Sequence, residues 1–108
     1  MKRLAVLISN KGTGTNLQAI IDACQSGKLN AKIAAVISDT QEALGLKRAK
    51  KHNLPIVICP QKEDLLPILK KLKPDYVCLA GWKKIVTADV IDAYANKILN
   101  LHPGLVPD

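Results

Sequence analysis

The chain has 108 residues, of which 48% are hydrophobic and 23% are charged, a balance typical of a globular domain and not of a disordered segment. This length fits one domain and excludes two ordinary ones, and no apolar run reaches the roughly 18 residues that a membrane-spanning helix needs. The 16 Lys and Arg residues exceed the 9 Asp and Glu residues, so the formal net charge is +7. Only Arg3 and Arg48 are arginines, the preferred readers of bases and phosphates. The charge therefore indicates a lysine-rich solvated surface, or attraction of a small anion, more than binding of nucleic acid.

Three cysteines, Cys24, Cys59 and Cys78, lack any spacing typical of a metal site or a redox pair. Cys59 and Cys78 lie inside apolar runs, which indicates small core residues. An odd, unpatterned set of this kind predicts reduced thiols in a cytoplasmic protein without a bound metal.

Short aliphatic runs alternate with longer amphipathic segments from the start of the chain. Residues 3–9 contain a continuous aliphatic run, which predicts a strand buried on both faces of a parallel sheet. After a turn with two glycines, residues 16–26 place apolar side chains on one face at helical spacing, and Gly27 ends that predicted helix. A second strand is predicted at 32–38 and a second helix at 42–52.

The third predicted strand, at 54–59, carries Pro55 at its start and is followed by Pro60. Proline has no N–H to donate, so this pair indicates an outer position in the sheet. The remaining elements alternate helix and strand, and Thr87 is a candidate cap for the last helix. They are predicted at 63–72, 75–80, 87–94 and 98–102.

The alternation of strand and helix predicts an α/β fold with a doubly wound parallel sheet and helices on both faces. We expect five strands in the order 3-2-1-4-5, which puts the reversal of strand order between the first and fourth strands. Ligands of such sheets bind at this reversal, beyond the carboxyl ends of the strands.

The segment between the first strand and the first helix is the first candidate binding site. Gly12 and Gly14 allow positive φ angles and close approach of the backbone to a ligand, beside the N-terminus of a helix. Thr13, Thr15 and Asn16 add short polar groups, so the loop predicts a phosphate or ribose site. The alternative is an ordinary turn in which Thr15 or Asn16 caps the helix.

Two well-known glycine motifs fit this loop poorly. It is not a Walker loop, because no Gly-Lys-Ser/Thr sequence follows the glycines. It is an incomplete dinucleotide fingerprint, because Leu17 stands where the third glycine belongs, although Asp39 at the end of the second strand could hold a ribose.

The end of the last predicted strand is the second candidate site. Asn100 and His102 are two residues apart, so on a strand they point to the same side, and Leu99 and Leu101 are expected to pack behind them. A side-chain amide can stabilise an oxyanion and an imidazole can move a proton near neutral pH, which together suit acyl transfer. The alternative is a polar strand end with a structural histidine. His52, among lysines at a helix end, is predicted to be structural.

The loop after the fourth strand is the third candidate site. Trp82, Ile85 and Val86 could form the wall of a flat apolar pocket. Lys83 and Lys84 could meet a carboxylate at the same place. The alternative is a loop whose apolar side chains simply cover the end of the sheet.

Several stretches of the sequence together resemble one enzyme family. They are Leu7-Ile8-Ser9, Gly12-Thr13-Gly14-Thr15-Asn16-Leu17-Gln18-Ala19-Ile20-Ile21, Leu79-Ala80-Gly81-Trp82 and Leu99-Asn100-Leu101-His102-Pro103-Gly104-Leu105-Val106-Pro107. The chain is similar, nearly end to end, to the phosphoribosylglycinamide formyltransferases. The Asn-x-His-Pro stretch is shared by the wider group of enzymes that use 10-formyltetrahydrofolate, and the glycine loop is more specific to this family.

The resemblance implies transfer of a formyl group from 10-formyltetrahydrofolate to the amine of glycinamide ribonucleotide in purine synthesis, with no metal. It implies that the loop from Gly12 to Asn16 holds the phosphate and ribose of the substrate. It implies that Asn100 stabilises the oxyanion and that His102 transfers the proton. The folate pocket implied by the resemblance comprises Lys62, Lys83, Lys84, Ile85, Val86 and Asn100.

In this family a second part of about the same length follows, and it carries a catalytic Asp and the rest of the folate site. The resemblance therefore implies that residues 1–108 are a single nucleotide-binding domain, the N-terminal half of the enzyme, inactive or nearly so alone. We expect such a half to dimerise or aggregate through an exposed sheet edge and apolar face. Two rival interpretations stay open. One is another formyl-folate enzyme, such as methionyl-tRNA formyltransferase or formyltetrahydrofolate hydrolase, and the other is a non-catalytic module that binds a phosphate or nucleotide.

Overall fold

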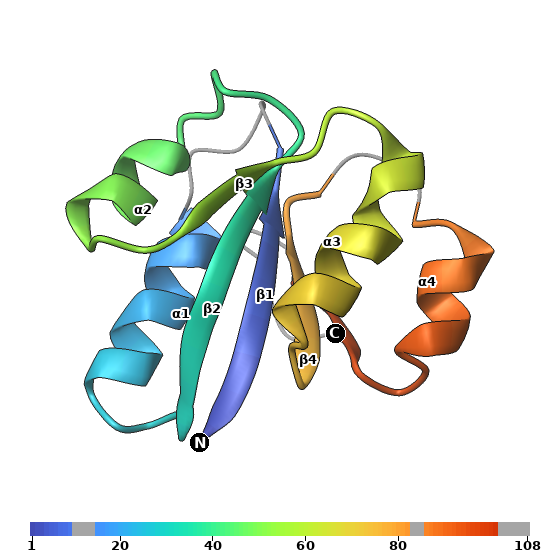
Figure 1. Ribbon diagram of the computed structural model, residues 1–108. Coiled ribbons are helices and arrows are strands. Elements are labelled where there is room, and N and C mark those ends of the chain that lie inside the picture. Colours follow the sequence, from blue (N-terminus) through green and yellow to red (C-terminus); the bar gives the residue numbers. More distant parts are fainter. Residues whose placement is uncertain (10–14, 83–85, 102–108) are drawn as a thin grey trace.

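The computed structural model of the protein describes residues 1–9, 15–82 and 86–101. Its five strands form one parallel sheet in the order β3-β2-β1-β4-β5, which confirms the predicted order (Figure 1). The strands are β1 (Lys2–Ile8), β2 (Ala31–Ser38), β3 (Ile56–Ile58), β4 (Tyr76–Ala80) and β5 (Ile98–Leu101). The helices are α1 (Thr15–Gln25), α2 (Leu46–Lys51), α3 (Leu65–Leu72) and α4 (Ala88–Ala93), with a 3-10 helix, η1 (Lys62–Asp64), ahead of α3.

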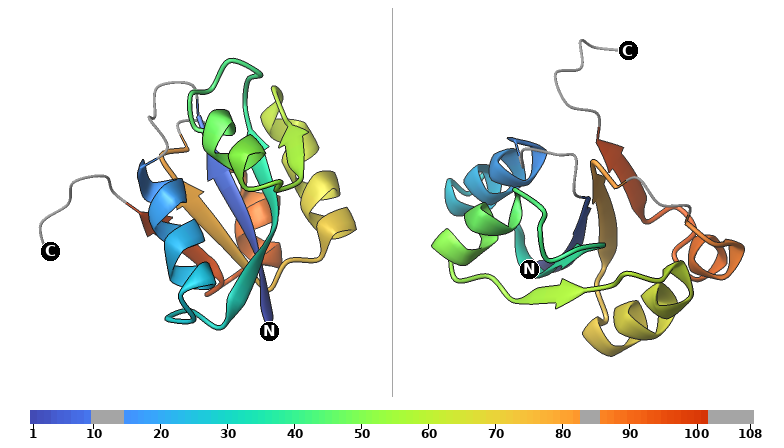
Figure 2. Two further views of the ribbon diagram at one scale, coloured as in Figure 1. Left: turned by 90° about the vertical axis from the view of Figure 1, so that its left-hand side faces the viewer. Right: turned by 90° about the horizontal axis from the view of Figure 1, so that it is seen from above.

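The central strand β1 is buried on both faces of the sheet. Helices α1 and α2 cover one face and α3 and α4 cover the other, as the alternating chain order requires (Figure 2). Leu4, Val6 and Ile8 of β1 belong to the core cluster on the α1 and α2 side. Ala5 and Leu7 belong to the cluster on the α3 and α4 side. This alternation explains why the strand needs a continuous aliphatic run.

Helix α2 begins at Leu46 and not at Glu42, so the predicted start of the second helix is wrong. Residues 42–45 form turns instead, in which the Glu42 N–H donates to the Thr40 hydroxyl at 3.2 Å and the Leu46 N–H donates to the Ala43 carbonyl at 3.1 Å. Threonine offers the backbone such local bonds in place of a helix, and Gly45 is a poor helix former.

Strand β3 is shorter than predicted, because prolines lie on both sides of it. Pro55 lies just before the strand, where its carbonyl accepts the Val36 N–H at 2.8 Å, and Pro60 lies beyond its end. The strand occupies the outer position that the two prolines predicted.

Helix α4 is capped differently from the prediction. Thr87 stands at the N-cap, but its hydroxyl makes no capping bond to the backbone and donates instead to the Asp89 carboxylate. That carboxylate accepts the Val90 N–H at 2.9 Å. The hydrogen bond from the Thr87 hydroxyl is also the main reason that the pKa of Asp89 is lowered. In the described part of the chain, no helix is long and apolar enough to cross a membrane.

Candidate active site

The carboxyl ends of β1, β4 and β5 lie side by side, because all three strands run in the same direction. They form the carboxyl edge of the sheet, which is distinct from its two outer strands, β3 and β5. Leu7 of β1 pairs with Leu79 of β4, and Leu79 pairs in turn with Asn100 of β5. The start of α1 and the end of β5 therefore lie at the same carboxyl edge, as predicted. A ligand that spans this edge could contact both.

Helix α1 begins at Thr15, so its N-terminal amides face this edge next to the end of β1. Thr15 and Asn16 are the first two residues of the helix. Leu17 is fully buried, at 0% exposed, so the position that a dinucleotide fingerprint gives to glycine is here a core anchor. Gly12, Thr13 and Gly14 lie outside the described residues.

Two buried polar atoms at this edge have no hydrogen-bond partner among the described residues. They are Oδ1 of Asp39, just after β2, and Nε1 of Trp82, just after β4. The turn at Asp39 is fixed by the fully buried Ser38, whose hydroxyl donates to the Thr40 carbonyl at 2.6 Å. Leaving a buried polar atom unpaired costs about 1–3 kcal/mol, so both atoms are candidate ligand contacts. Sequence reasoning considered both residues but missed their unpaired atoms, because burial of single atoms leaves no sequence pattern.

The loop after β4 contributes to the core. Trp82 and Val86 are half-buried and pack against the cluster between the sheet and the α3 and α4 helices. This packing fits both interpretations of the loop, a pocket wall and a cover for the end of the sheet. Lys83, Lys84 and Ile85 lie outside the described residues.

Asn100 is exposed and lies next to the last residue of β5. Ile98 packs against the cluster on the α3 and α4 side, so Asn100, two residues further on, belongs to the same side of the strand. The prediction that Leu99 packs behind Asn100 is wrong, because Leu99 is 47% exposed. The cluster under α1 and α2 contains no described β5 side chain, which explains the exposure. His102 lies outside the described residues.

Lys62 is exposed and lies in η1, between β3 and α3. Because β3 and β5 are the opposite edges of the sheet, strand pairing does not bring Lys62 next to Asn100. Figure 1 shows η1 at the carboxyl end of the sheet, so Lys62 shares the end of the molecule at which α1 begins.

Comparison with known proteins gives the family. The sequence model described as formyl transferase matches residues 2–108. The chain belongs to the formyl transferase family. It is 47% identical over 116 residues to the phosphoribosylglycinamide formyltransferase of Haemophilus influenzae and 38% identical over 113 residues to that of Escherichia coli. The solved structure of glycinamide ribonucleotide transformylase 1 from Symbiobacterium toebii matches it with a TM-score of 0.86 at 40% identity.

These matches cover this chain almost completely but cover only part of each relative. They span 99% of this chain and 54% of the Haemophilus protein, 96% and 52% for the Escherichia protein, and 99% and 54% for the Symbiobacterium structure. The chain therefore spans about half the length of the relatives it matches. The family predicted from the glycine loop and the Asn-x-His-Pro stretch is confirmed.

The three cysteines form no disulfide bond within the described part of the chain, and they lie in or near the core. Cys59 and Cys78 are buried, as predicted, and Cys24 is half-buried. Burial, and to a lesser extent Cys24, raises the pKa of Cys78 to about 11, and burial also raises the pKa of Cys24. Because the thiolate is the nucleophilic form, the raised pKa values disfavour nucleophilic chemistry by these two thiols at neutral pH. Within the described residues no group of three or more His, Cys, Asp or Glu side chains could hold a metal ion.

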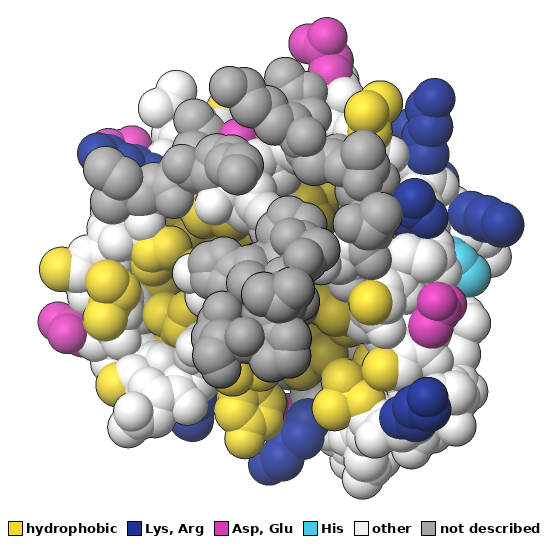
Figure 3. Space-filling model, turned by 180° about the vertical axis from the view of Figure 1, so that it is seen from behind, with side chains coloured by type: hydrophobic (Ala, Val, Ile, Leu, Met, Phe, Trp, Pro, Cys, Tyr) yellow, Lys and Arg dark blue, Asp and Glu magenta, His cyan; other side chains and the backbone are white. Residues whose placement is uncertain are grey.

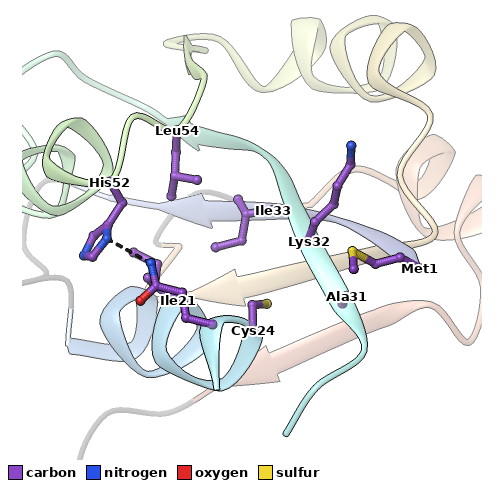
Figure 4. A pocket seen from close by; sticks show the side chains of 9 residues that line it. Met1, Ile21, Cys24, Ala31, Lys32, Ile33, His52 and Leu54 are labelled. Carbon is purple, nitrogen blue, oxygen red and sulfur yellow. Dashed lines mark hydrogen bonds between the residues drawn. The ribbon is translucent and has the colours of Figure 1, made fainter. Parts of the chain in front are cut away.

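His52 lies at the other end of the sheet, which fits its predicted structural role. It ends α2, where its N–H donates to the Arg48 carbonyl at 3.3 Å, and its Nδ1 accepts the Gln25 amide at 3.2 Å. It lines a shallow hollow of about 290 Å³ near the start of β2 (Figure 4). The hollow is lined by Met1, Ile21, Cys24, Gln25, Ala31, Lys32, Ile33, His52 and Leu54.

Proposed function

We propose that this chain is the substrate-binding half of an enzyme that transfers a formyl group from 10-formyltetrahydrofolate to the amine of glycinamide ribonucleotide. The observation that carries the proposal is that the N-terminus of α1 and Asn100 lie at one edge of the same parallel sheet. The names of the Haemophilus and Escherichia relatives support the same reaction. The proposal includes a cytoplasmic enzyme that needs no metal.

Each substrate would have its own part of this edge. The phosphate and ribose of glycinamide ribonucleotide would bind the segment from Gly12 to Asn16, where backbone amides and the α1 dipole favour an anion. Oδ1 of Asp39 and Nε1 of Trp82 would gain partners from a bound substrate, which would remove the cost of leaving them unpaired. The folate pocket would comprise Lys62, Lys83, Lys84, Ile85, Val86 and Asn100.

The chemistry would be a direct acyl transfer without a covalent enzyme intermediate. The substrate amine attacks the formyl carbon, a C–N bond forms, and the carbonyl electron pair moves onto oxygen. The Asn100 amide donates a hydrogen bond to that oxyanion, an interaction typically worth about 10²–10³ in rate. His102 takes a proton from the attacking nitrogen and delivers it to N10 of the folate as the bond from the formyl carbon to N10 breaks. The products are the formylated ribonucleotide and tetrahydrofolate.

Calorimetric titration of the 108-residue chain with glycinamide ribonucleotide tests the binding half of the proposal. We expect saturable binding that Gly14→Val abolishes, because a branched side chain prevents close approach of the backbone to a phosphate. Ala19→Val is the matched control, because Ala19 is exposed on α1, away from the edge. A folded chain that does not bind the ribonucleotide would contradict the proposal. Steeply salt-dependent binding of oligonucleotides would instead favour a nucleic-acid partner.

Catalysis is best tested in a chimaera of this chain with the remaining part of the Haemophilus protein. We expect the chimaera to formylate glycinamide ribonucleotide and not methionyl-tRNA, and the chain alone to turn over well below roughly 1 per second. Transfer only to methionyl-tRNA, or only hydrolysis of the formyl-folate, would favour one of the rival enzymes.

A further inference from the structure

Charged side chains are distributed unevenly between the two ends of the sheet. The starts of the strands and the ends of the helices form its amino edge, opposite the carboxyl edge. The described basic residues of the amino edge are Lys2, Arg3, Lys28, Lys32, Arg48, Lys50, Lys51, Lys70, Lys71, Lys73 and Lys97, and the acidic ones are Asp22, Asp75 and Asp92. The described basic residues of the carboxyl edge are Lys47 and Lys62, and the acidic ones are Asp39, Glu42, Glu63, Asp64 and Asp89. Positive charge in the described part of the chain is therefore concentrated at the amino edge.

Helix termini explain only part of this asymmetry. Cations stabilise the C-terminal turn of a helix, which accounts for the basic last turns of α2 and α3. Lys2 and Lys32 belong to strands and Lys28 lies in the turn after α1, and all three are exposed. In Figure 3, Lys and Arg side chains gather at the bottom, where the strands start, and at the right, where α2 lies. Like charges gathered on one exposed surface attract an anionic partner.

The hollow near the start of β2 lies within this basic surface. Lys32 and His52 contribute to its lining, and no described Asp or Glu does. Figure 4 shows the side chains of Ile21, Ile33 and Leu54 facing a common space. The volume of about 290 Å³ is just below the range of small-molecule sites, about 300–1,000 Å³, and the hollow is shallow. It therefore suits one apolar side chain of a larger partner.

Two features favour a polypeptide partner over a nucleic acid. The Arg3 guanidinium donates to the Leu72 carbonyl at 2.9 Å and the Arg48 guanidinium donates to the Gln18 side chain at 3.3 Å. Both arginines, the residues best suited to phosphate, are thus already engaged within the chain. The lining of the hollow also contains no Phe, Tyr or Trp on which a base would stack.

We propose that the amino edge docks an acidic segment of another protein. One apolar side chain of that segment sits in the hollow, and neighbouring carboxylates lie beside Lys2, Lys28 and Lys32. The start of α1 and Asn100 lie at the carboxyl edge, so the docked segment leaves the candidate active site accessible. The proposal does not depend on the proposed reaction, so binding of this segment and catalysis fail or succeed separately.

Fluorescence anisotropy of a labelled peptide, mixed with the 108-residue chain, tests the proposal. The probe is a short polyglutamate peptide with one central leucine. We expect saturable binding that weakens as the salt concentration rises, because salt screens the attraction between exposed charges. Replacement of the leucine by glutamine should weaken binding at least about tenfold, the effect of losing one buried aliphatic side chain.

Paired variants of the chain locate the binding surface. Lys2→Gln combined with Lys32→Gln should weaken binding at least about threefold, the loss expected for two exposed ion pairs. Gln41→Glu combined with Gln61→Glu is the matched control, because it lowers the net charge equally at exposed positions of the carboxyl edge. The control should change binding by less than about twofold, because the added charges lie far from the peptide. Bound peptide should also slow alkylation of Cys24, which lines the hollow.

Four results would overturn the proposal. They are the absence of peptide binding, equal weakening by the two pairs of substitutions, binding that ignores the central leucine, and an unchanged alkylation rate of Cys24. Tighter binding of a single-stranded oligonucleotide, lost with Lys2→Gln and Lys32→Gln, would instead assign the amino edge to nucleic acid. Circular dichroism of each variant checks that the exposed substitutions leave the fold intact.

Discussion

Leu17→Ala tests whether α1 is anchored beside the candidate phosphate loop by core packing. Leu17 is fully buried in the first turn of α1, within the cluster that includes Leu4, Val6 and Ile8 of β1. Truncation of a buried leucine removes its transfer free energy and leaves a cavity, which together cost about 2–5 kcal/mol. Alanine is the better helix former, so no loss of helix propensity adds to this cost.

A loss near the middle of that range, about 3 kcal/mol, is a large part of the stability of a domain of this size. It should lower the melting temperature by roughly 12–24 °C, at about 4–8 °C per kcal/mol. Urea unfolding followed by circular dichroism measures the free energy of unfolding directly. Leu44→Ala is the matched control, because Leu44 is 51% exposed and its truncation should change stability by at most about 0.5 kcal/mol. If the two substitutions lower the free energy of unfolding by similar amounts, Leu17 is not a core anchor and the dinucleotide alternative regains support.

Three further predictions follow from the same geometry. In the chimaera with the Haemophilus segment, Asn100→Ala should lower kcat by about 10²–10³ with little change in KM, and an unchanged kcat would remove Asn100 from the chemistry. Because burial raises the pKa of Cys78 from 9.0 to about 11, its contribution to stability is full below pH 9.0 and is lost as the pH rises towards 11. Urea midpoints of the parent chain should therefore fall more over that interval than those of Cys78→Ala. In hydrogen exchange of the isolated chain, amides of β5 should exchange faster than those of β1, which is paired on both sides. Equal protection of the two strands would show that β5 needs no further support.

The sheet order followed from the sequence because each aliphatic run was separated from the next by a helix-length segment. Right-handed crossovers leave few arrangements for such a chain, and the prolines beside β3 placed that strand at an edge. The late start of α2 escaped prediction because it depends on a local bond between Glu42 and Thr40. The wrong prediction for Leu99 has a different cause. Alternation along a strand tells which side a residue is on, but not whether another element covers that side.

For the candidate site, the positions of the strand ends were predictable from the sequence and the unpaired atoms were not. Parallel strands place all their carboxyl ends at one edge, so motifs after β1 and at the end of β5 had to share it. The unpaired atoms of Asp39 and Trp82 depend on the burial of individual atoms, which no residue spacing encodes. Periodicity predicted which strand ends meet, and only the coordinates show which polar atoms there lack partners.

The position of Asn100 in the sheet determines how firmly its amide is held. Stabilisation of an oxyanion requires a donor that is already held in place before the reaction. Among the described residues, β5 pairs with β4 alone, and Leu99, the neighbour of Asn100, is exposed on the face that the helices do not reach. Whatever covers Leu99 would therefore also restrict the movement of Asn100. Slow turnover by the 108-residue chain would then reflect, in part, an amide donor that is loosely held before the reaction.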